Sequence, residues 1–216
     1  MTKEQIKQEF LLQDEDALRA CFPQMHPLSG DKVQTALDEH SRAFIERSPF
    51  LCLGTQSKDG SADVSPRGDQ AGFVKILDEK TMVIPERPGN NRLDTLGNIV
   101  SNPSVGLLFL VPGFDDTMRV NGTAQISNDP DLLALMAVKE RPALASIIVT
   151  VDEVFIHCAK AFRRSKLWDT ASHQDRGELP SIAQIIMKQT NTLPDNPEEI
   201  EKIDRDIEEE YKNTLY

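Results

Sequence analysis

A series of short apolar or alternating segments, separated by turn residues, runs from residue 50 to residue 127 and constrains the fold more than any other feature. Two of them flank residues 57–60, whose Asp-Gly pair is a strong signal for a β-hairpin. Short strands joined by tight turns predict an antiparallel barrel or sandwich. The predicted strands are FLCLGT (50–55), SADVSPRGD (61–69) with a break at Pro66 and Gly68, GFVKIL (72–77), TMVIP (81–85), the continuous apolar run SVGLLFLVP (104–112), MRVNGTAQIS (118–127) and SIIVTVDEVFIHC (146–158).

Helical patterns flank and interrupt these strands. Apolar residues recur at roughly helical spacing before Pro49, with a turn-rich linker at 23–30 and with Ser29 and Asp31 as start signals for a second helix. Residues 93–103, 129–140 and the C-terminal part of the chain are also helix-like. We expect an N-terminal helical segment packed on the barrel (1–48), the barrel domain (49–170) and a C-terminal helical extension (171–216), which is a mainly β, α+β fold.

Composition excludes several classes of protein. The net charge is -11, and residues 195–211 alone, with nine Asp/Glu against two Lys/Arg, account for -7 of it. An acidic chain disfavours non-specific nucleic-acid binding, which needs cations to neutralise phosphates. No window approaches the roughly 20 apolar residues that span a bilayer. Three cysteines, Cys21, Cys52 and Cys158, show no CxxC spacing, so we expect no disulfide framework and a cytoplasmic location.

The loop IPERPGNNR (84–92) is richer in special residues than a turn requires. Two prolines stiffen it, and Gly89 permits a close backbone approach to a ligand. The helix that follows directs its unpaired N–H groups toward the loop, and the guanidinium groups of Arg87 and Arg92 suit phosphate oxygens. From the residues alone, two interpretations stay open: an anion site, or a stiff loop whose asparagines cap the helix.

Two further basic stretches can carry chemistry. Arg67 ends the strand at 61–69, and it converges with Arg92 if that strand neighbours the one ending at residue 85. Its Arg-Gly-Asp tripeptide is an adhesion motif that short chance matches also produce. FRRSKLW (162–168) joins Arg163, Arg164 and Lys166 to the single tryptophan, Trp168. It is either a patch for a phosphate or a flat ring, or a solvated segment whose tryptophan anchors on the core.

Metal chemistry and nucleophilic catalysis lack a signal in the sequence. His157 and Cys158 are adjacent on a predicted strand, so their side chains point to opposite faces and cannot ligate one metal ion. The other histidines show no metal-ligand spacing. GxSxG, Walker and GxGxxG motifs are absent. We therefore name no catalytic side chain and no metal site.

The order of these stretches resembles a known family. SADVSPRGD, then VIPERPGNNR, then LDTLGNIVSNPSVGLLFLVPG and MRVNGTAQIS are similar to the FMN-binding split barrel of the pyridoxamine 5'-phosphate oxidase superfamily. More narrowly, the chain resembles a branch of flavoproteins that shares RPGNNR and HCAKAFRRSKLW. The resemblance covers residues 50–168 and implies an antiparallel split β-barrel that binds FMN between the two subunits of a homodimer.

The resemblance also implies positions for the flavin. Ser65, Arg67 and Gly68 stand where an arginine-containing strand end of the superfamily lies along the flavin and its ribityl-phosphate. Ile84 and Pro85 stand where the next long strand approaches the edge of the ring through backbone groups.

The implied phosphate grip differs from that of the vitamin B6 oxidases. Asn90, Asn91 and Arg92 replace a serine-arginine-lysine turn, so one cation is missing and Arg87 is the candidate to replace it. Thr117 stands where those oxidases carry a glutamine that faces the flavin. Their C-terminal Arg-Leu-His-Asp-Arg substrate motif is absent, so we do not expect a pyridoxamine phosphate substrate.

The partner subunit's contribution follows from the same resemblance. Arg163, Lys166 and Trp168 match the basic and aromatic set that a second subunit adds to the site. The implied function is an FMN-dependent oxidoreductase that acts on a small organic substrate or on reduced nicotinamide, with the flavin performing the redox step. The alternative is a split-barrel protein that holds flavin or haem as a sensor or carrier without turnover.

Overall fold

The structure is a computed structural model that describes residues 6–216. Residues 1–5, which the sequence assigns to the N-terminal helical segment, lie outside the described residues. The chain divides into two compact units, Met1–Val33 and Gln34–Tyr216. The predicted division at residues 48 and 170 stays a prediction, since compactness alone does not define domains.

The first unit contains short helices. They are η2 (Gln8–Phe10), α1 (Glu15–Ala20) and α2 (Pro27–Asp31). Asp14 caps α1 by accepting a hydrogen bond from the Ala17 N–H at 2.8 Å. A helix therefore lies inside the predicted linker at 23–30. Pro27 opens it because the first turn of a helix does not use the missing N–H of proline.

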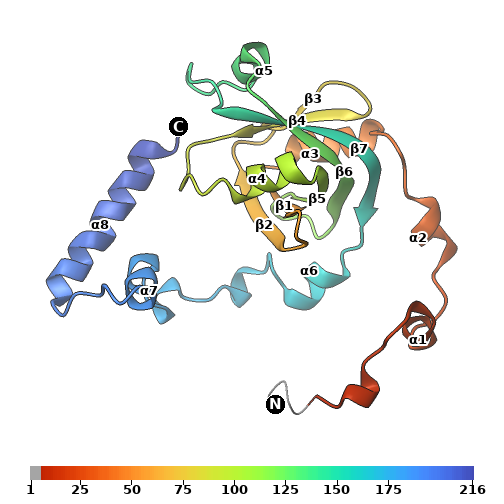
Figure 1. The fold of residues 1–216 in the computed structure, drawn as a ribbon, viewed down its shortest axis with the longest axis horizontal. Coiled ribbons are helices and arrows are strands. Elements are labelled where there is room, and N and C mark those ends of the chain that lie inside the picture. The colour runs from red at the N-terminus through yellow and green to blue at the C-terminus, as the bar shows by residue number, and fades with distance from the viewer. Residues whose placement is uncertain (1–5) are drawn as a thin grey trace. The chain divides into compact units, whose positions relative to one another are not determined.

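The second unit is built on one seven-stranded sheet with the strand order β2-β1-β5-β6-β7-β4-β3 (Figure 1). Every neighbouring pair is antiparallel, which confirms the predicted fold class. No pairing joins β2 to β3 or β4 within residues 6–216, so the sheet keeps two free edges. The strands are β1 (Phe50–Gln56), β2 (Ala62–Gly68), β3 (Lys75–Ile76), β4 (Thr81–Glu86), β5 (Ser104–Leu110), β6 (Thr117–Ser127) and β7 (Ala145–His157).

The core lies on one face of these strands. In β5, Val105, Leu107 and Phe109 are buried, while the residues between them are only half-buried. The continuous apolar run is therefore a strand with one fully buried face, rather than a strand buried on both faces. β1 alternates in the same way and buries Leu51 and Leu53.

The predicted break in the second strand is wrong. Pro66 and Gly68 both pair with β1, opposite Cys52 and Phe50. Because β2 is at the edge of the sheet, a proline can lie in it with its missing N–H on the unpaired side. β3, by contrast, is limited to two residues of the predicted segment 72–77.

The second N-terminal helix begins later than predicted. Helix α3 (Glu39–Arg47) is capped by Asp38, which accepts from the Ser41 N–H at 2.7 Å. Ser29 and Asp31 are therefore not its start signals. The preceding residues run along the sheet, where Gln34 exchanges two backbone hydrogen bonds with Val154. The helix ends at Arg47, before Pro49, as the sequence predicts.

The helices α4, α5, α7 and α8 follow predicted segments, whereas α6, η3 and η4 lie in stretches for which no helix was predicted. α5 ends early because Val138 and Arg141 pair in a tight turn whose central residues, Lys139 and Glu140, have positive φ. No helix within residues 6–216 has the length and apolar character needed to cross a membrane. The elements are α4 (Asp94–Ser101), α5 (Pro130–Leu135), α6 (Lys160–Ser165), η3 (Thr170–Ser172), η4 (Arg176–Glu178), α7 (Ile182–Gln189) and α8 (Pro197–Thr214).

Candidate functional site

A cavity of about 680 Å³ lies between β2, the end of β4 and the start of α4. The loop that connects β4 to α4, whose course Figure 1 shows, supplies residues 87–93 of its lining. Eight of the predicted cofactor residues line this one cavity, although they come from two separate segments of the chain. They are Ser65, Arg67, Gly68, Pro85, Arg87, Asn90, Asn91 and Arg92.

The inward face of β2 supplies polar side chains. Strand alternation places Asp63, Ser65 and Arg67 on the same, partly buried face. Arg67 Nη1 donates to Ser65 Oγ at 2.5 Å and to the Pro66 carbonyl at 2.9 Å. These two hydrogen bonds hold Nη1 of the guanidinium against β2, the strand that carries Arg67.

Arg67 meets a carboxylate across the cavity. Its Nε lies 3.1 Å from Oε2 of Glu86, and the two side chains are only 15% and 20% exposed. The alignment is not that of a hydrogen bond, so both buried atoms lack a hydrogen-bond partner within the described residues. Burial raises the pKa of Glu86 above its ordinary value, and the charge of Arg67 offsets part of this shift.

The loop before α4 contains two residues with left-handed backbone and ends at a helix start without a side-chain cap. Asn91 and Leu93 have positive φ, 56° and 60°, which is uncommon for residues other than glycine. Asn90 Oδ1 accepts from the Arg92 N–H at 3.1 Å. Leu93 occupies the N-cap position of α4 and provides no side-chain cap, so no side chain satisfies the first N–H groups of this helix.

Arg92 projects from this loop into solvent. Its side chain is 74% exposed, and its Nε lies 2.7 Å from Oδ2 of Asp94. A surface pair of this kind contributes little to stability. Arg92 is therefore free to exchange its partner for a ligand oxygen at low cost.

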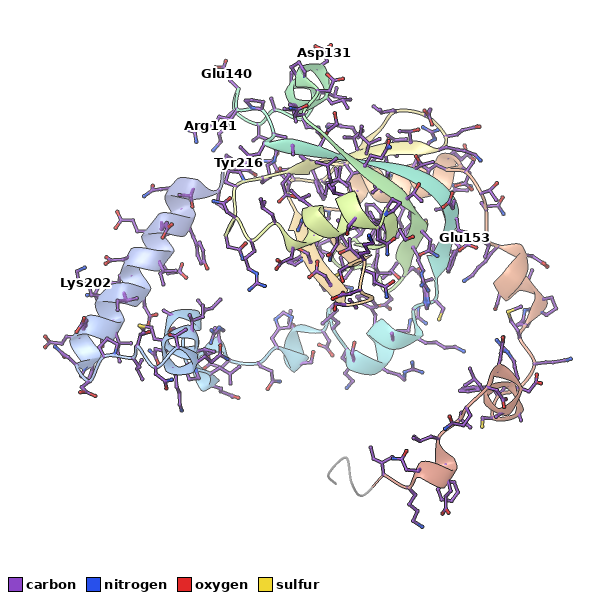
Figure 2. The ribbon with its side chains drawn as sticks, viewed as in Figure 1. Asp131, Glu140, Arg141, Glu153, Lys202 and Tyr216 are labelled. Atoms are coloured by element: carbon purple, nitrogen blue, oxygen red, sulfur yellow. The ribbon has the colours of Figure 1, made fainter. Side chains whose placement is uncertain are left out.

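Arg87, predicted to replace the missing phosphate cation, is already engaged. Its Nε lies 2.9 Å from Oδ2 of Asp69, a side chain only 2% exposed, and its Nη2 donates to the Met136 carbonyl at 2.8 Å. The Tyr216 ring lies 6.0 Å from the guanidinium, and the Tyr216 hydroxyl donates to Asp69 at 2.8 Å. Tyr216, which follows α8, lies beside Arg141, whose Nη1 donates to its backbone oxygen (Figure 2). Arg87 thus borders the cavity mainly as a structural anchor for the loop.

A buried network fixes the first turn of α4. Thr95 Oγ1 donates to Asp63 Oδ2 at 2.7 Å, and the buried Thr55 hydroxyl contacts the same oxygen at 3.4 Å. Asn98 Nδ2 donates to Thr55 Oγ1 at 3.1 Å. The network therefore ties the helix start to β1 and β2. No local sequence pattern predicts this network, because its members come from three separate elements.

The remaining predicted residues lie outside the cavity. Ile84 is fully buried in the core and pairs with Ile147 of β7. Thr117, also buried, begins β6 opposite His157. Neither residue is part of the cavity lining.

The basic and aromatic set forms a separate group around α6. Arg163 Nε lies 3.0 Å from Oδ2 of Asp115, and Trp168 Nε1 donates to the Phe114 carbonyl at 2.7 Å. Lys166 caps α6 at its C-terminal end with a φ of 52°. Arg163, Lys166 and Trp168 do not line the cavity of their own chain.

An antiparallel sheet with two unjoined edges, and a polar cavity beside them, is the architecture of a split barrel. The family model for pyridoxamine 5'-phosphate oxidase matches residues 37–158, more than half of the chain. The chain belongs to this family. Comparison with curated proteins gives no match.

Solved structures share parts of this fold. HupZ from Group A Streptococcus is 18% identical and aligns with a TM-score of 0.47 over 56% of this chain and 93% of its own. A proposed pyridoxamine 5'-phosphate oxidase from Lactobacillus delbrueckii is 24% identical, with a TM-score of 0.45 over 56% of this chain and 95% of its own. General Stress Protein 26 from Bacillus anthracis is 16% identical, with a TM-score of 0.42 over 53% and 88%. At these identities and scores the likeness carries no functional assignment.

Proposed function

We propose that this protein binds FMN in the cavity between β2 and α4 and acts as a flavin-dependent oxidoreductase on a small organic substrate or on reduced nicotinamide. The observation that carries the proposal is the uncapped start of α4, preceded by a loop with two left-handed residues and the exposed Arg92. Helix N-termini with free N–H groups and a nearby cation are suited to phosphate.

The cavity has the groups that FMN requires. Arg67 Nε is buried at its wall without a hydrogen-bond partner among the described residues, which suits a ligand oxygen. Val64, Leu93 and Leu144 also line the cavity, and each is more than half exposed in this structure. Apolar surface beside a phosphate site favours a ligand that carries a flat ring over a bare anion.

Different residues of the cavity would hold different parts of the cofactor. Asn90, Asn91 and Arg92, with the start of α4, would hold the phosphate. Ser65, Arg67 and Gly68 would lie along the ribityl chain and the ring, and Ile84 and Pro85 would place backbone groups at the ring edge. Bound flavin supplies electron and hydride transfer, while the protein positions it and balances its charge.

Flavin fits this cavity better than haem does. Haem iron in proteins is held by His, Cys, Met or Tyr side chains. The described lining of the cavity contains none of these four residue types. Of the two cofactors that a carrier of this fold would hold, the cavity therefore favours FMN.

The proposal includes a homodimer. The partner subunit's Arg163, Lys166 and Trp168 would complete the site from the far side of the ring. Their position outside the cavity of their own chain is consistent with this role.

The visible spectrum of the purified protein tests the proposal. Titration with FMN should quench flavin fluorescence and shift its absorption bands. Reduced nicotinamide should bleach the bound flavin, and air should restore the colour. A protein that takes up no FMN would contradict the cofactor assignment, and one that binds FMN but never bleaches with any electron donor would be a carrier.

The phosphate assignment predicts the behaviour of Arg92→Ala. One charge-assisted hydrogen bond to phosphate contributes roughly 1.5–3 kcal/mol, so FMN affinity should fall by about 10- to 100-fold. Fluorescence titration measures this change, and the denaturation midpoint of the apoprotein should stay the same because Arg92 is exposed.

Arg205→Ala is the matched control. Arg205 is another exposed arginine beside a carboxylate, 3.7 Å from Glu201 on α8. Its loss should leave FMN affinity unchanged. Equal affinities for wild type and Arg92→Ala would remove the phosphate assignment.

A further inference from the structure

Glu86 and Arg67 meet where the sheet is not joined. Arg67 belongs to β2 and Glu86 to β4, and no backbone pairing connects these strands within the described chain. The Glu86 backbone is held in place, since its carbonyl accepts from the Leu144 N–H at 3.0 Å. The two side chains therefore meet at the wall of the cavity, and they extend from strands that are not paired with each other.

The Arg67 and Glu86 side chains are close together, but their geometry is not that of a hydrogen bond. The Nε to Oε2 distance is 3.1 Å, yet neither atom has a hydrogen bond from any described residue. The guanidinium is instead hydrogen-bonded through Nη1 to its own strand. A buried carboxylate in this position is balanced by the charge of one arginine and by little else.

Two other cations line the cavity, and neither is paired with Glu86 in the described chain. Arg87, the next residue, is held by Asp69 and the Met136 carbonyl, and the exposed Arg92 pairs with Asp94 and is the residue proposed to hold the phosphate. The remaining charged group of the lining, Asp63 on β2, has the same sign as Glu86 and is hydrogen-bonded to Thr95, so it offers Glu86 no countercharge. Phe73, Leu144 and Ala145, the cavity residues before β3 and at the start of β7, carry no charge.

We infer that Glu86 takes up a proton from solvent when a ligand enters the cavity and its oxygen atoms draw the Arg67 guanidinium away from the carboxylate. The inference rests on the proposed binding of FMN. In this binding equilibrium, the free protein has an ionised Glu86. It takes up the ligand and one proton, and the resulting complex has a neutral Glu86 carboxyl group. This is consistent with the direction in which burial already displaces the pKa of Glu86.

The coupling between protonation of Glu86 and ligand binding predicts whether the ligand affinity rises or falls with pH, and this direction can be measured. Since the ligand raises the pKa of Glu86, the complex binds more protons than the free protein between the two pKa values. Affinity for the ligand therefore rises as the pH falls through that window, by up to about tenfold for each pH unit. The neutral carboxyl group then becomes a hydrogen-bond donor at the wall of the loaded cavity.

Calorimetric titration of FMN into the full chain tests the inference. The titration is repeated in two buffers of different ionisation enthalpy, at a series of pH values that extends to mildly alkaline pH, where the phosphate, with a second pKa of about 6, is already ionised. Wild type should take up more protons per FMN than Glu86→Gln does, by at most one proton, at the pH values between the pKa of Glu86 in the free protein and its pKa in the complex. The phosphate and all other groups contribute equally to both proteins.

A second measurement needs no variant. The infrared difference spectrum of wild type with and without FMN should gain the carbonyl band of a protonated carboxylic acid. Equal proton uptake in both proteins, or an infrared spectrum without that band, would overturn the role of Glu86 while leaving FMN binding intact. Failure of wild type to bind FMN at all would instead overturn the proposed function.

Discussion

Gly122→Ala is expected to destabilise the barrel more than the replacement of any other glycine of this chain with alanine. A Cβ at Gly122 would lie 2.0 Å from the Thr150 carbonyl oxygen, a backbone atom that cannot turn aside. The site is in the β6–β7 pair, where Asn121 opposes Glu153 and Gly122 opposes Val151, so Asp152 is bulged out of the register. We expect a loss of about 3 kcal/mol or more, the upper range for overpacking, in denaturant unfolding followed by circular dichroism.

Gly97→Ala is the control, and it should stabilise the protein instead of destabilising it. Gly97 lies inside α4, and a Cβ there meets no atom within 4 Å. Replacing a helical glycine with alanine should stabilise the protein by roughly 0.5–1 kcal/mol. If Gly122→Ala unfolded at the same denaturant concentration as wild type, the bulge between β6 and β7 would have to relax, and the backbone clash would not determine its stability.

Asp69→Asn is expected to cost about 3–5 kcal/mol at neutral pH, the usual cost of removing one partner of a buried ion pair. The variant leaves the Arg87 guanidinium, itself mostly buried, without its countercharge. Burial by itself would raise the pKa of Asp69. The hydrogen bonds from the Gln70 N–H, the Tyr216 hydroxyl and Arg87 nevertheless hold that pKa below its ordinary value.

The sign of this shift predicts the pH dependence. Because folding lowers the pKa of Asp69, its contribution to stability is complete above the unfolded pKa of about 3.9 and is lost as the pH falls through the folded pKa. The free energies of unfolding of wild type and Asp69→Asn should therefore differ most at neutral pH and converge in acid. Denaturant titrations at a series of pH values measure this convergence.

Asp206→Asn provides the matched control for this prediction. Asp206 pairs with Lys202 at 2.8 Å on α8, but both side chains are exposed. Its removal should cost no more than about 0.5 kcal/mol. Similar losses for Asp69→Asn and Asp206→Asn would show that the Asp69–Arg87 pair is not a buried anchor of the loop.

The sheet was predictable because its signals are local. Alternation and the Asp-Gly turn placed β1, β2, β5, β6 and β7 to within one residue or so at most ends. The predicted start of α3 was wrong because Ser29, Asp31 and Asp38 all carry side chains that can cap a helix. The backbone of Gln34, which lies before α3, is instead hydrogen-bonded to Val154 of β7. Such a contact joins residues far apart in sequence, and no local pattern contains it.

The same distinction separates the predicted and unpredicted parts of the site. The expected convergence of Arg67 and Arg92 is found, since both line one cavity, but the strands assumed to be neighbours are not paired. The partners of the cavity arginines were not predictable. Asp69 precedes Arg87 by many residues and Glu86 faces Arg67 across the sheet edges, so sequence spacing reveals neither ion pair.

The unjoined edges of the sheet have a consequence for how a ligand enters. Elsewhere in the barrel, parting two neighbouring strands would break a ladder of backbone hydrogen bonds. Between β2 and β4 the structure, over residues 6–216, shows one ion pair, that of Arg67 and Glu86, and it involves side chains alone. A ligand that entered between these two strands would therefore have to displace side chains but would break no backbone ladder, so its entry would not require local unfolding of the barrel.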